Sequence, residues 1–308
     1  MNIQIISSII SDTLQAATPL ILAALGELVT EKSGVLNLGV EGMMLVGAIA
    51  GFIAASILGN IYLGLLIGLV SGIAIALIYA LLVITISANQ VATGLALSIF
   101  GSGLSAFVGA GYVGKTITGL QPVSIPVLKS IPILGEALFN QDILVYASVV
   151  LVMLAWWFLR QTRAGLVLQS IGESPAAADA LGLPVYRVRY LAVIFGGAMA
   201  GLAGGYLSLA YTPLWTENMT AGRGWIAIAL VVFATWKPQR ILLGAYLFGG
   251  VSAIQLILQA LGVDISPYLL SSLPYLATIL VLTLISHDNT RIQLGVPASL
   301  GQPFRSTH

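Results

Sequence analysis

The chain has 308 residues, and only 7% of them are charged: 12 are Lys or Arg and 11 are Asp or Glu. Typical soluble domains are about 25% charged, whereas hydrophobic residues make up 58% of this chain. A soluble globule needs a more charged surface than this, and a disordered chain has far fewer apolar residues. The composition therefore excludes both classes and predicts a protein that crosses a lipid bilayer several times.

The ionisable residues exclude several functions. The formal net charge of +1 gives no positive field for nucleic acid, so we expect no nucleic-acid partner. Cys is absent, which removes disulfides, thiolate nucleophiles and Cys-ligated metals. The two histidines, His287 and His308, lie near the C-terminus and make a poor metal site. We therefore expect no metal, no cofactor and no catalytic residues.

Residues 42–114 form the longest segment without an Asp, Glu, Lys, Arg or His. These 73 residues would make a helix of roughly 110 Å, whereas a bilayer core is about 30 Å thick. The segment must therefore cross the membrane about three times. The small and polar residues at Gly59-Asn60 and at residues 87–90 are the predicted breaks.

Six further charge-free segments each predict one more span. They are residues 13–26, 143–159, 190–216, 224–236, 241–263 and 265–286. Only helices and closed barrels satisfy backbone polar groups in lipid, and long runs without alternation favour helices. The sequence therefore predicts an all-α bundle of about nine transmembrane helices, with a range of eight to ten, in one membrane domain over residues 1–308.

The distribution of Lys and Arg between the loops predicts the orientation in the membrane. If residues 160–189 are cytoplasmic and the spans alternate from there, nine cations lie inside and three outside. The nine are Lys32, Arg160, Arg163, Arg187, Arg189, Lys237, Arg240, Arg291 and Arg305; the three are Lys115, Lys129 and Arg223. This bias predicts an external N-terminus, a cytoplasmic C-terminus and an external loop over residues 112–142.

The loop at residues 160–189 contains a predicted short helix. Ser174 is a suitable N-cap, and Pro175 suits the first helical position. Gly182 can end the helix, and Pro184 prevents its continuation. The expected result is an Ala-rich helix of two turns outside the membrane, which is thin enough to insert into a groove of another protein.

Ionisable side chains within the predicted spans are functional candidates because they are costly to bury in lipid. Glu41 is the clearest, and Asn37 precedes it by four residues, so both lie on one helix face. Glu41 either faces a substrate pathway, or is a buried partner of Lys32, or caps a helix near the interface. Glu27 and Glu31 flank Lys32 and are expected at the membrane interface.

Three other groups of residues have expected roles. One begins a predicted helix, where it either contacts a polar substrate or caps the helix: Asn89, Gln90 and Thr93. Another brackets a short external loop that a docking partner could contact: Glu217, Asn218 and Arg223. The third consists of glycines at four-residue spacing, which let helix backbones approach closely as general packing or as a hinge: Gly64, Gly68, Gly72 and Gly197, Gly201, Gly205.

The predicted short helix resembles an element of known transport proteins. Residues 173–182 (ESPAAADALG) resemble the EAA-type coupling loop of ATP-binding-cassette (ABC) importer permeases, with Ser174-Pro175 where alanine would be expected. Residues 196–205 (GGAMAGLAGG) are similar to the next helix in the permeases for branched-chain amino acids and simple sugars. The resemblance implies that six residues receive the movement of the ATPase subunits: Gly172, Glu173, Ala177, Ala178, Asp179 and Gly182.

Two other segments extend this resemblance to about residues 15–290. Residues 34–44 (GVLNLGVEGMM) look like the early signature of the same permeases. Residues 220–229 (TAGRGWIAIA), followed by Trp236, most resemble the nucleoside-importer branch, which depends on a BmpA-type lipoprotein. The resemblance therefore implies a nucleoside as the small-molecule substrate.

The resemblance also implies an assembly in a bacterial plasma membrane. The chain would pair with a second permease subunit, homologous or identical, on two ABC ATPase subunits, and an external lipoprotein would deliver the substrate. ATP-driven closure of the ATPases would switch the pathway between outward and inward access, so the chain itself is not expected to be an enzyme. The alternatives are a permease for simple sugars or branched-chain amino acids, or an ion-driven secondary transporter. A secondary transporter usually has more intramembrane carboxylates and detectable internal repeats.

Overall fold

The computed structural model describes residues 3–124, 134–260 and 295–305, together with isolated positions between 269 and 283. Seven helices of the described residues are long and apolar enough to cross a membrane, some of them continued by a short π- or 3₁₀-helical turn. They are α1 (Ile3–Lys32), α2 (Val40–Leu58), α3 (Ile61–Ala80) with η1 (Leu81–Thr85), α4 (Gln90–Gly109) with η2 (Ala110–Tyr112), α6 (Ile143–Gln161), α9 (Val185–Tyr206) with η3 (Leu207–Tyr211), and α11 (Pro238–Ala260).

Shorter elements connect these spans. Four are helices: α5 (Leu134–Phe139), α7 (Arg163–Glu173), α8 (Pro175–Ala180) and α10 (Arg223–Phe233). The strands β1 (Val123–Ser124) and β2 (Asn140–Gln141) pair antiparallel. The predicted helical class is therefore confirmed for the described residues.

Both predicted breaks in residues 42–114 are confirmed. Gly59 ends α2 in a left-handed conformation. The Asn60 side chain then caps α3 by accepting hydrogen bonds from the backbone nitrogens of Tyr62 and Leu63. Asn89 caps α4 in the same way, with 2.9 Å between its Oδ1 and the Ala92 nitrogen. Small and polar residues thus end each span because they satisfy the free backbone groups of helix ends.

The expected count of about nine spanning helices is not confirmed. Most of the helix predicted at residues 265–286 lies outside the described residues. The helix at residues 224–236 is α10, whose 11 residues extend about 16 Å and cannot cross a core of about 30 Å.

The chain nevertheless passes from one end of the bundle to the other around α10. At one end, the Leu120 nitrogen donates to the Leu209 carbonyl over 3.0 Å. At the other end, the Trp236 indole donates to Glu31, near the last residue of α1. Residues 212–222 form a loop that covers the first part of this distance, and α10 covers the rest. Helix α10 is therefore a half-helix that begins inside the bundle.

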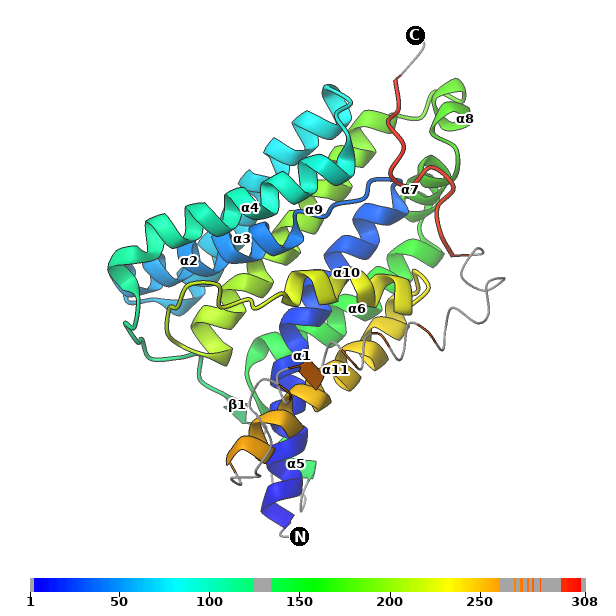
Figure 1. Ribbon diagram of the computed structural model, residues 1–308. Helices are drawn as coiled ribbons and strands as arrows, with labels where there is room; N and C mark the ends of the chain where they lie inside the picture. Colours follow the sequence, from blue (N-terminus) through cyan, green and yellow to red (C-terminus); the bar gives the residue numbers. More distant parts are fainter. Residues whose placement is uncertain are drawn as a thin grey trace.

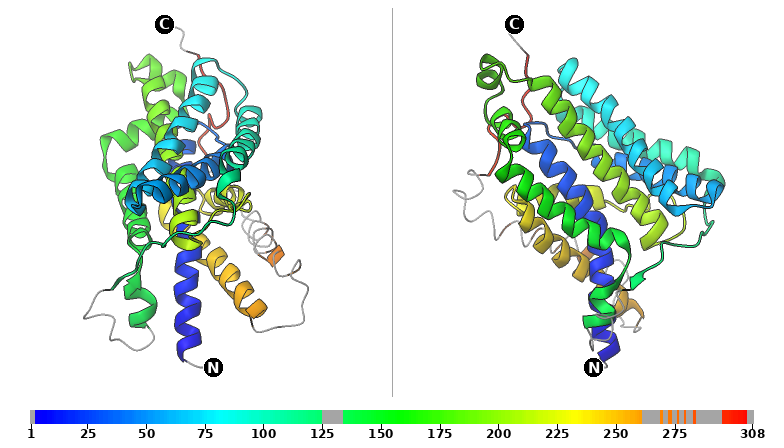
Figure 2. Two further views of the ribbon diagram at one scale, coloured as in Figure 1. Left: turned by 90° about the vertical axis from the view of Figure 1, so that its left-hand side faces the viewer. Right: turned by 180° about the vertical axis from the view of Figure 1, so that it is seen from behind.

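Helix α9 packs between α1 and the layer formed by α2 and α3 (Figure 2). The two glycine ladders meet here, and their spacing had predicted a close approach of helix backbones. A Cβ added to Gly72 would lie 2.2 Å from the Gly197 carbonyl oxygen, and one added to Gly201 would lie 2.3 Å from that of Gly68. A Cβ on Gly47 of α2 would also meet Gly201, at 2.5 Å. Hydrogen atoms at these positions therefore let three helix backbones touch.

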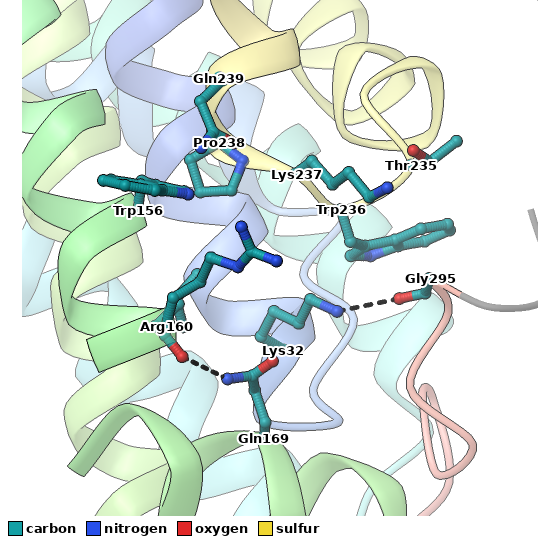
Figure 3. Close-up of a pocket in the computed structure, with 11 residues that line it drawn as sticks. Lys32, Trp156, Arg160, Gln169, Thr235, Trp236, Lys237, Pro238, Gln239 and Gly295 are labelled. Atoms are coloured by element: carbon teal, nitrogen blue, oxygen red, sulfur yellow. Dashed lines mark hydrogen bonds between the residues drawn. The ribbon is translucent and has the colours of Figure 1, made fainter. Parts of the chain in front are cut away.

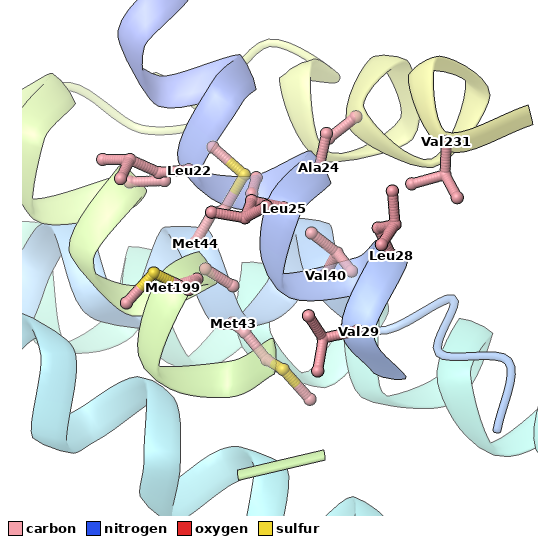
Figure 4. Packing of buried hydrophobic residues seen from close by; sticks show 14 of the residues in the cluster. Leu22, Ala24, Leu25, Leu28, Val29, Val40, Met43, Met44, Met199 and Val231 are labelled. Carbon is pink, nitrogen blue, oxygen red and sulfur yellow. The ribbon is translucent and has the colours of Figure 1, made fainter. Parts of the chain in front are cut away.

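A cluster of buried side chains lies where α1, α2 and α9 meet. It contains Leu25 and Leu28 of α1, Met43 and Met44 of α2, and Met199 of α9 (Figure 4). These side chains are fully or almost fully buried. This cluster holds the start of α2, and with it Glu41, in the interior of the bundle.

The α6 start is tied to the α9 end by a buried carboxylate. Asp142 Oδ1 accepts hydrogen bonds from the Leu144 and Val145 nitrogens at 2.9 and 3.2 Å, and Oδ2 accepts from the Tyr206 hydroxyl at 2.9 Å. Burial raises the pKa of Asp142, although these hydrogen bonds oppose the increase. The Asp142 carboxylate therefore holds the start of α6 against the end of α9.

The N-terminus and α8 lie at opposite ends of the molecule (Figure 1). The segment at residues 295–305 lies beside α7, because Ser299 donates to the Gly172 carbonyl through both its nitrogen and its hydroxyl, at 3.0 and 2.6 Å. Arg189 Nη2 also donates to the Ser299 hydroxyl, at 3.3 Å. We call this end of the bundle, with α7, α8 and residues 295–305, the α8 end.

Candidate substrate pathway and coupling element

Glu41 lies in the first turn of α2 and binds the start of α10. Its Oε1 accepts hydrogen bonds from the Thr220 hydroxyl at 2.5 Å and the Gly222 nitrogen at 2.9 Å. Its Oε2 accepts from the Gly224 nitrogen at 2.6 Å. Glu41 therefore caps the start of α10, and its negative charge suits the positive ends of both α2 and α10, whereas its role in a substrate pathway stays a prediction. Lys32 is not its partner, since the Lys32 ammonium donates to the Gly295 carbonyl.

This group lies inside the bundle and not at its surface. A Cβ added to Gly224 would lie 2.6 Å from the Glu41 backbone, so the two helix starts touch. Ser98, which lines the same cavity as Glu41, is eight residues beyond the start of α4, or about 12 Å along the helix. A broken helix that ends at such a depth exposes backbone dipoles to a cavity, as at many transporter sites.

A cavity of about 330 Å³ opens beside Glu41. Its lining combines a carboxylate, an amide, two hydroxyls and an indole ring with a few apolar side chains. The residues are Glu41, Leu45, Ser98, Ile99, Ser102, Asn218, Ala221, Gly222 and Trp225. A mainly apolar wall with a few polar groups is typical of small-molecule sites, and an indole face suits a flat ring.

Of the five residues predicted for the pathway, only Glu41 lines this cavity. Asn37 is buried in the loop between α1 and α2, where its Oδ1 accepts a hydrogen bond from the Gly39 nitrogen at 2.9 Å. Asn89 caps α4, and Gln90 Oε1 accepts from the Leu36 nitrogen at 2.8 Å. For all five residues, Glu41 and Thr93 included, contact with substrate stays a prediction.

The residues expected at an external docking loop separate in the structure. Glu217 and Asn218 are both exposed, and Asn218 also lines the cavity. Arg223 Nη1 donates to the carbonyls of Met219 and Thr220, each at 3.3 Å. Arg223 therefore holds the shape of the loop before α10, and a docking role for these residues stays a prediction.

The predicted short helix is present as α8. The Ser174 hydroxyl accepts a hydrogen bond from the Ala177 nitrogen at 3.3 Å, and Pro175 is the first helical residue. Gly182 follows the helix with a φ of 75°, and no neighbouring atom lies within 4 Å of a Cβ added there. The caps read from the sequence therefore define this helix as expected. The preceding helix α7 was not predicted.

The predicted coupling residues divide into anchors and an outward face. Ala178 is buried against Ile171 and Val185, which fixes α8 to α7 and α9. Gly172 is buried below residues 295–305, and Glu173 Oε2 accepts a weak hydrogen bond from the Ala298 nitrogen at 3.4 Å. Ala177 and Gly182 are exposed, Asp179 is half-buried, and the neighbouring Leu181 is 80% exposed. An exposed leucine on a thin external helix is a suitable contact for another protein.

Two carboxylates near the end of α1 are buried within the protein. Glu27 and Glu31 are each only 1% exposed, and their expected position at the membrane interface stays a prediction. Glu27 accepts a hydrogen bond from the Asn37 nitrogen at 2.9 Å, and Glu31 accepts one from Trp236. Their burial follows from partners that are distant in the sequence, which also explains why Thr220 and Trp225 were not predicted for the site.

The spanning helices, the half-helix with a polar cavity at its start, and the external helix α8 together define a membrane-embedded transport permease. The chain belongs to the family described as branched-chain amino acid transport system / permease component, which it matches over residues 9–285. It is thus a multi-pass permease of an ABC importer. Permeases of this kind are translocating subunits that work with ATPase and substrate-binding partners.

Relatives carry names of sugar and nucleoside permeases. The chain is 43% identical, over 97% of both proteins, to a Haloferax volcanii protein provisionally named as a glucose ABC transporter permease. It is 35% identical to the guanosine ABC transporter permease of Bacillus subtilis, over 91% of this chain and 92% of that protein. It is 29% identical to the nucleoside ABC transporter permease of Lactococcus lactis, over 90% of this chain and 91% of that protein.

Proposed function

We propose that this chain is the permease subunit of a nucleoside importer, in which the cavity beside Glu41 forms part of the pathway. The cavity carries the proposal because its lining suits a nucleoside. The Trp225 ring can stack on the base, and Asn218 and the serine hydroxyls can form hydrogen bonds with the polar groups of the base and the sugar. Its volume of about 330 Å³ is in the range of small-molecule sites. Two relatives with nucleoside names support the same substrate class.

The proposed assembly places the α8 end in the cytoplasm. Lys32, Arg160 and Lys237 all lie at this end, in agreement with the preference of Lys and Arg for cytoplasmic loops. There α8 would contact one of two ATPase subunits, and a second permease subunit would complete the pathway. An external lipoprotein would deliver the nucleoside at the opposite end.

A sugar is the second candidate substrate, because the most similar of the relatives above is provisionally named for glucose. Uptake by the assembled transporter in vesicles separates the two. We expect saturable uptake of labelled guanosine that excess unlabelled nucleoside inhibits and excess glucose does not. Uptake of glucose that nucleosides fail to inhibit would contradict the proposed substrate.

Trp225→Ala tests the role of the cavity itself. Loss of a stacking face worth about 1–1.5 kcal/mol should raise the KM for nucleoside about tenfold while the protein remains in the membrane. Trp157→Ala is the matched control, since Trp157 is 54% exposed on α6 and does not line the cavity. An unchanged KM in the Trp225 variant would remove this cavity from the pathway.

Gly182→Glu tests the coupling element. The new side chain would project from α8 into open space, so it should block contact with an ATPase subunit without disturbing the fold. We expect uptake to fall at least tenfold. Gly59→Glu is the matched control, because Gly59 also has a positive φ, of 63°, and open space around it, at the opposite end. The backbone strain of about 1–2 kcal/mol is then the same in both variants. Equal uptake by both would refute the coupling role.

A further inference from the structure

A second pocket, of about 240 Å³, lies at the α8 end of the bundle (Figure 3). Three cationic side chains from separate elements line it: Lys32 at the end of α1, Arg160 at the end of α6, and Lys237 just before α11. No carboxylate is among the described residues that line it. The pocket therefore concentrates positive charge at the level where three membrane helices begin or end.

The described residues leave most of this charge unpaired. Lys32 donates to the Gly295 carbonyl at 3.0 Å, which uses one of its three N–H groups. Neither the Arg160 guanidinium nor the Lys237 ammonium has a hydrogen bond or ion pair with another described residue. Like charges held around one pocket repel each other, and a bound anion would remove that cost.

Two carboxylates near Lys32, Glu31 and Glu173, attract its ammonium, but their hydrogen bonds are made to other groups. Glu31 accepts the indole hydrogen bond of Trp236, and Glu173 accepts from the Ala298 nitrogen. Glu31 and Glu173 therefore offset part of the Lys32 charge, although neither forms a close ion pair with it among the described residues. Within the described part of the chain, Arg160 and Lys237 have no ion-pair partner, so an anion from outside the chain can bind beside them.

An additional donor lines the same pocket. The Trp156 Nε1 atom is buried and has no hydrogen-bond partner in the described part of the chain. A buried donor without an acceptor costs free energy, so an acceptor-rich ligand is favoured here. The first residues of α11, Pro238 and Gln239, also line the pocket, and the positive end of this 23-residue helix favours an anion.

We propose that this pocket binds the phosphate group of an anionic phospholipid in the leaflet at the α8 end. Phosphate supplies a negative charge and several acceptors to the three cations and to Trp156. The position at the ends of α1 and α6 matches the depth of lipid headgroups, where tryptophan and basic pockets between spans are typical. The inference does not depend on which substrate the permease carries.

Lipid binding to the purified full-length permease in detergent tests the proposal. Native mass spectrometry would compare phosphatidylglycerol with phosphatidylcholine, and inorganic phosphate would compete as a free anion. The double variant R160Q/K237Q should bind phosphatidylglycerol about tenfold more weakly than the unchanged protein. R163Q is the control, because Arg163 is an exposed cation of α7 that does not line the pocket.

The outcomes separate the possible ligands. Selective phosphatidylglycerol binding that is lost in R160Q/K237Q and kept in R163Q supports the lipid site. W156F should weaken this binding two- to threefold, because phenylalanine is aromatic but has no N–H group. Equal binding by R160Q/K237Q and R163Q would overturn the proposal. Complete competition by millimolar inorganic phosphate would overturn the lipid assignment in favour of a free anion.

Discussion

Glu41→Ala should reduce nucleoside uptake about 100-fold or more, because three donors at the start of α10 lose their acceptor together. The donors are the Thr220 hydroxyl and the nitrogens of Gly222 and Gly224. A hydrogen bond to a charged group contributes about 1.5–3 kcal/mol, so the start of the half-helix should lose several kcal/mol. The cavity wall formed by residues 218–225 would then lose its fixed position.

The measurement combines uptake with a local structural readout. The chain has no cysteine, so Asn218→Cys introduces a single thiol in the cavity wall. In the Glu41→Ala background this thiol should react faster with a soluble maleimide. Asp12→Ala, which removes an exposed carboxylate of α1, should leave uptake and labelling unchanged. Normal uptake in Glu41→Ala would refute the capping role.

Gly201→Ala should prevent stable folding of the bundle, although it adds only one methyl group. The new Cβ would lie 2.3 Å from the Gly68 carbonyl oxygen and 2.9 Å from the Gly72 Cα. These are backbone atoms of α3, so α3 and α9 would have to move apart. We expect a loss of about 3 kcal/mol or more, at the upper end of overpacking costs.

The matched control for this variant lies one turn along the same ladder. A Cβ added to Gly205 meets nothing closer than 3.7 Å, at Leu65 Cδ2. Gly205→Ala should therefore retain the wild-type melting temperature in detergent or exceed it slightly, since alanine favours a helix over glycine. Equal melting temperatures for Gly201→Ala and Gly205→Ala would show that the close contact is not limiting.

Features set by local chemistry were predictable from the sequence. Charge-free runs are long because lipid excludes ionisable groups, and they end at Gly59-Asn60 and Asn89 because these residues satisfy free helix ends. The helix α8 followed from Ser174, Pro175 and Gly182 for the same reason. Glycine spacing likewise indicated the close contact of helix backbones before the partner helices were known.

Only the tertiary structure decided what the polar residues contact. Apolar composition does not distinguish a spanning helix from the half-helix α10, because both are hydrophobic and the difference lies in where the chain starts to coil. Glu41 and Thr220 are 179 residues apart in the sequence, and no local pattern specifies their hydrogen bond. The cavity, the buried positions of Glu27 and Glu31, and the cationic pocket at Lys32 likewise result from contacts between distant segments. Local propensity therefore defined the individual helices, whereas the packing of distant helices formed the sites.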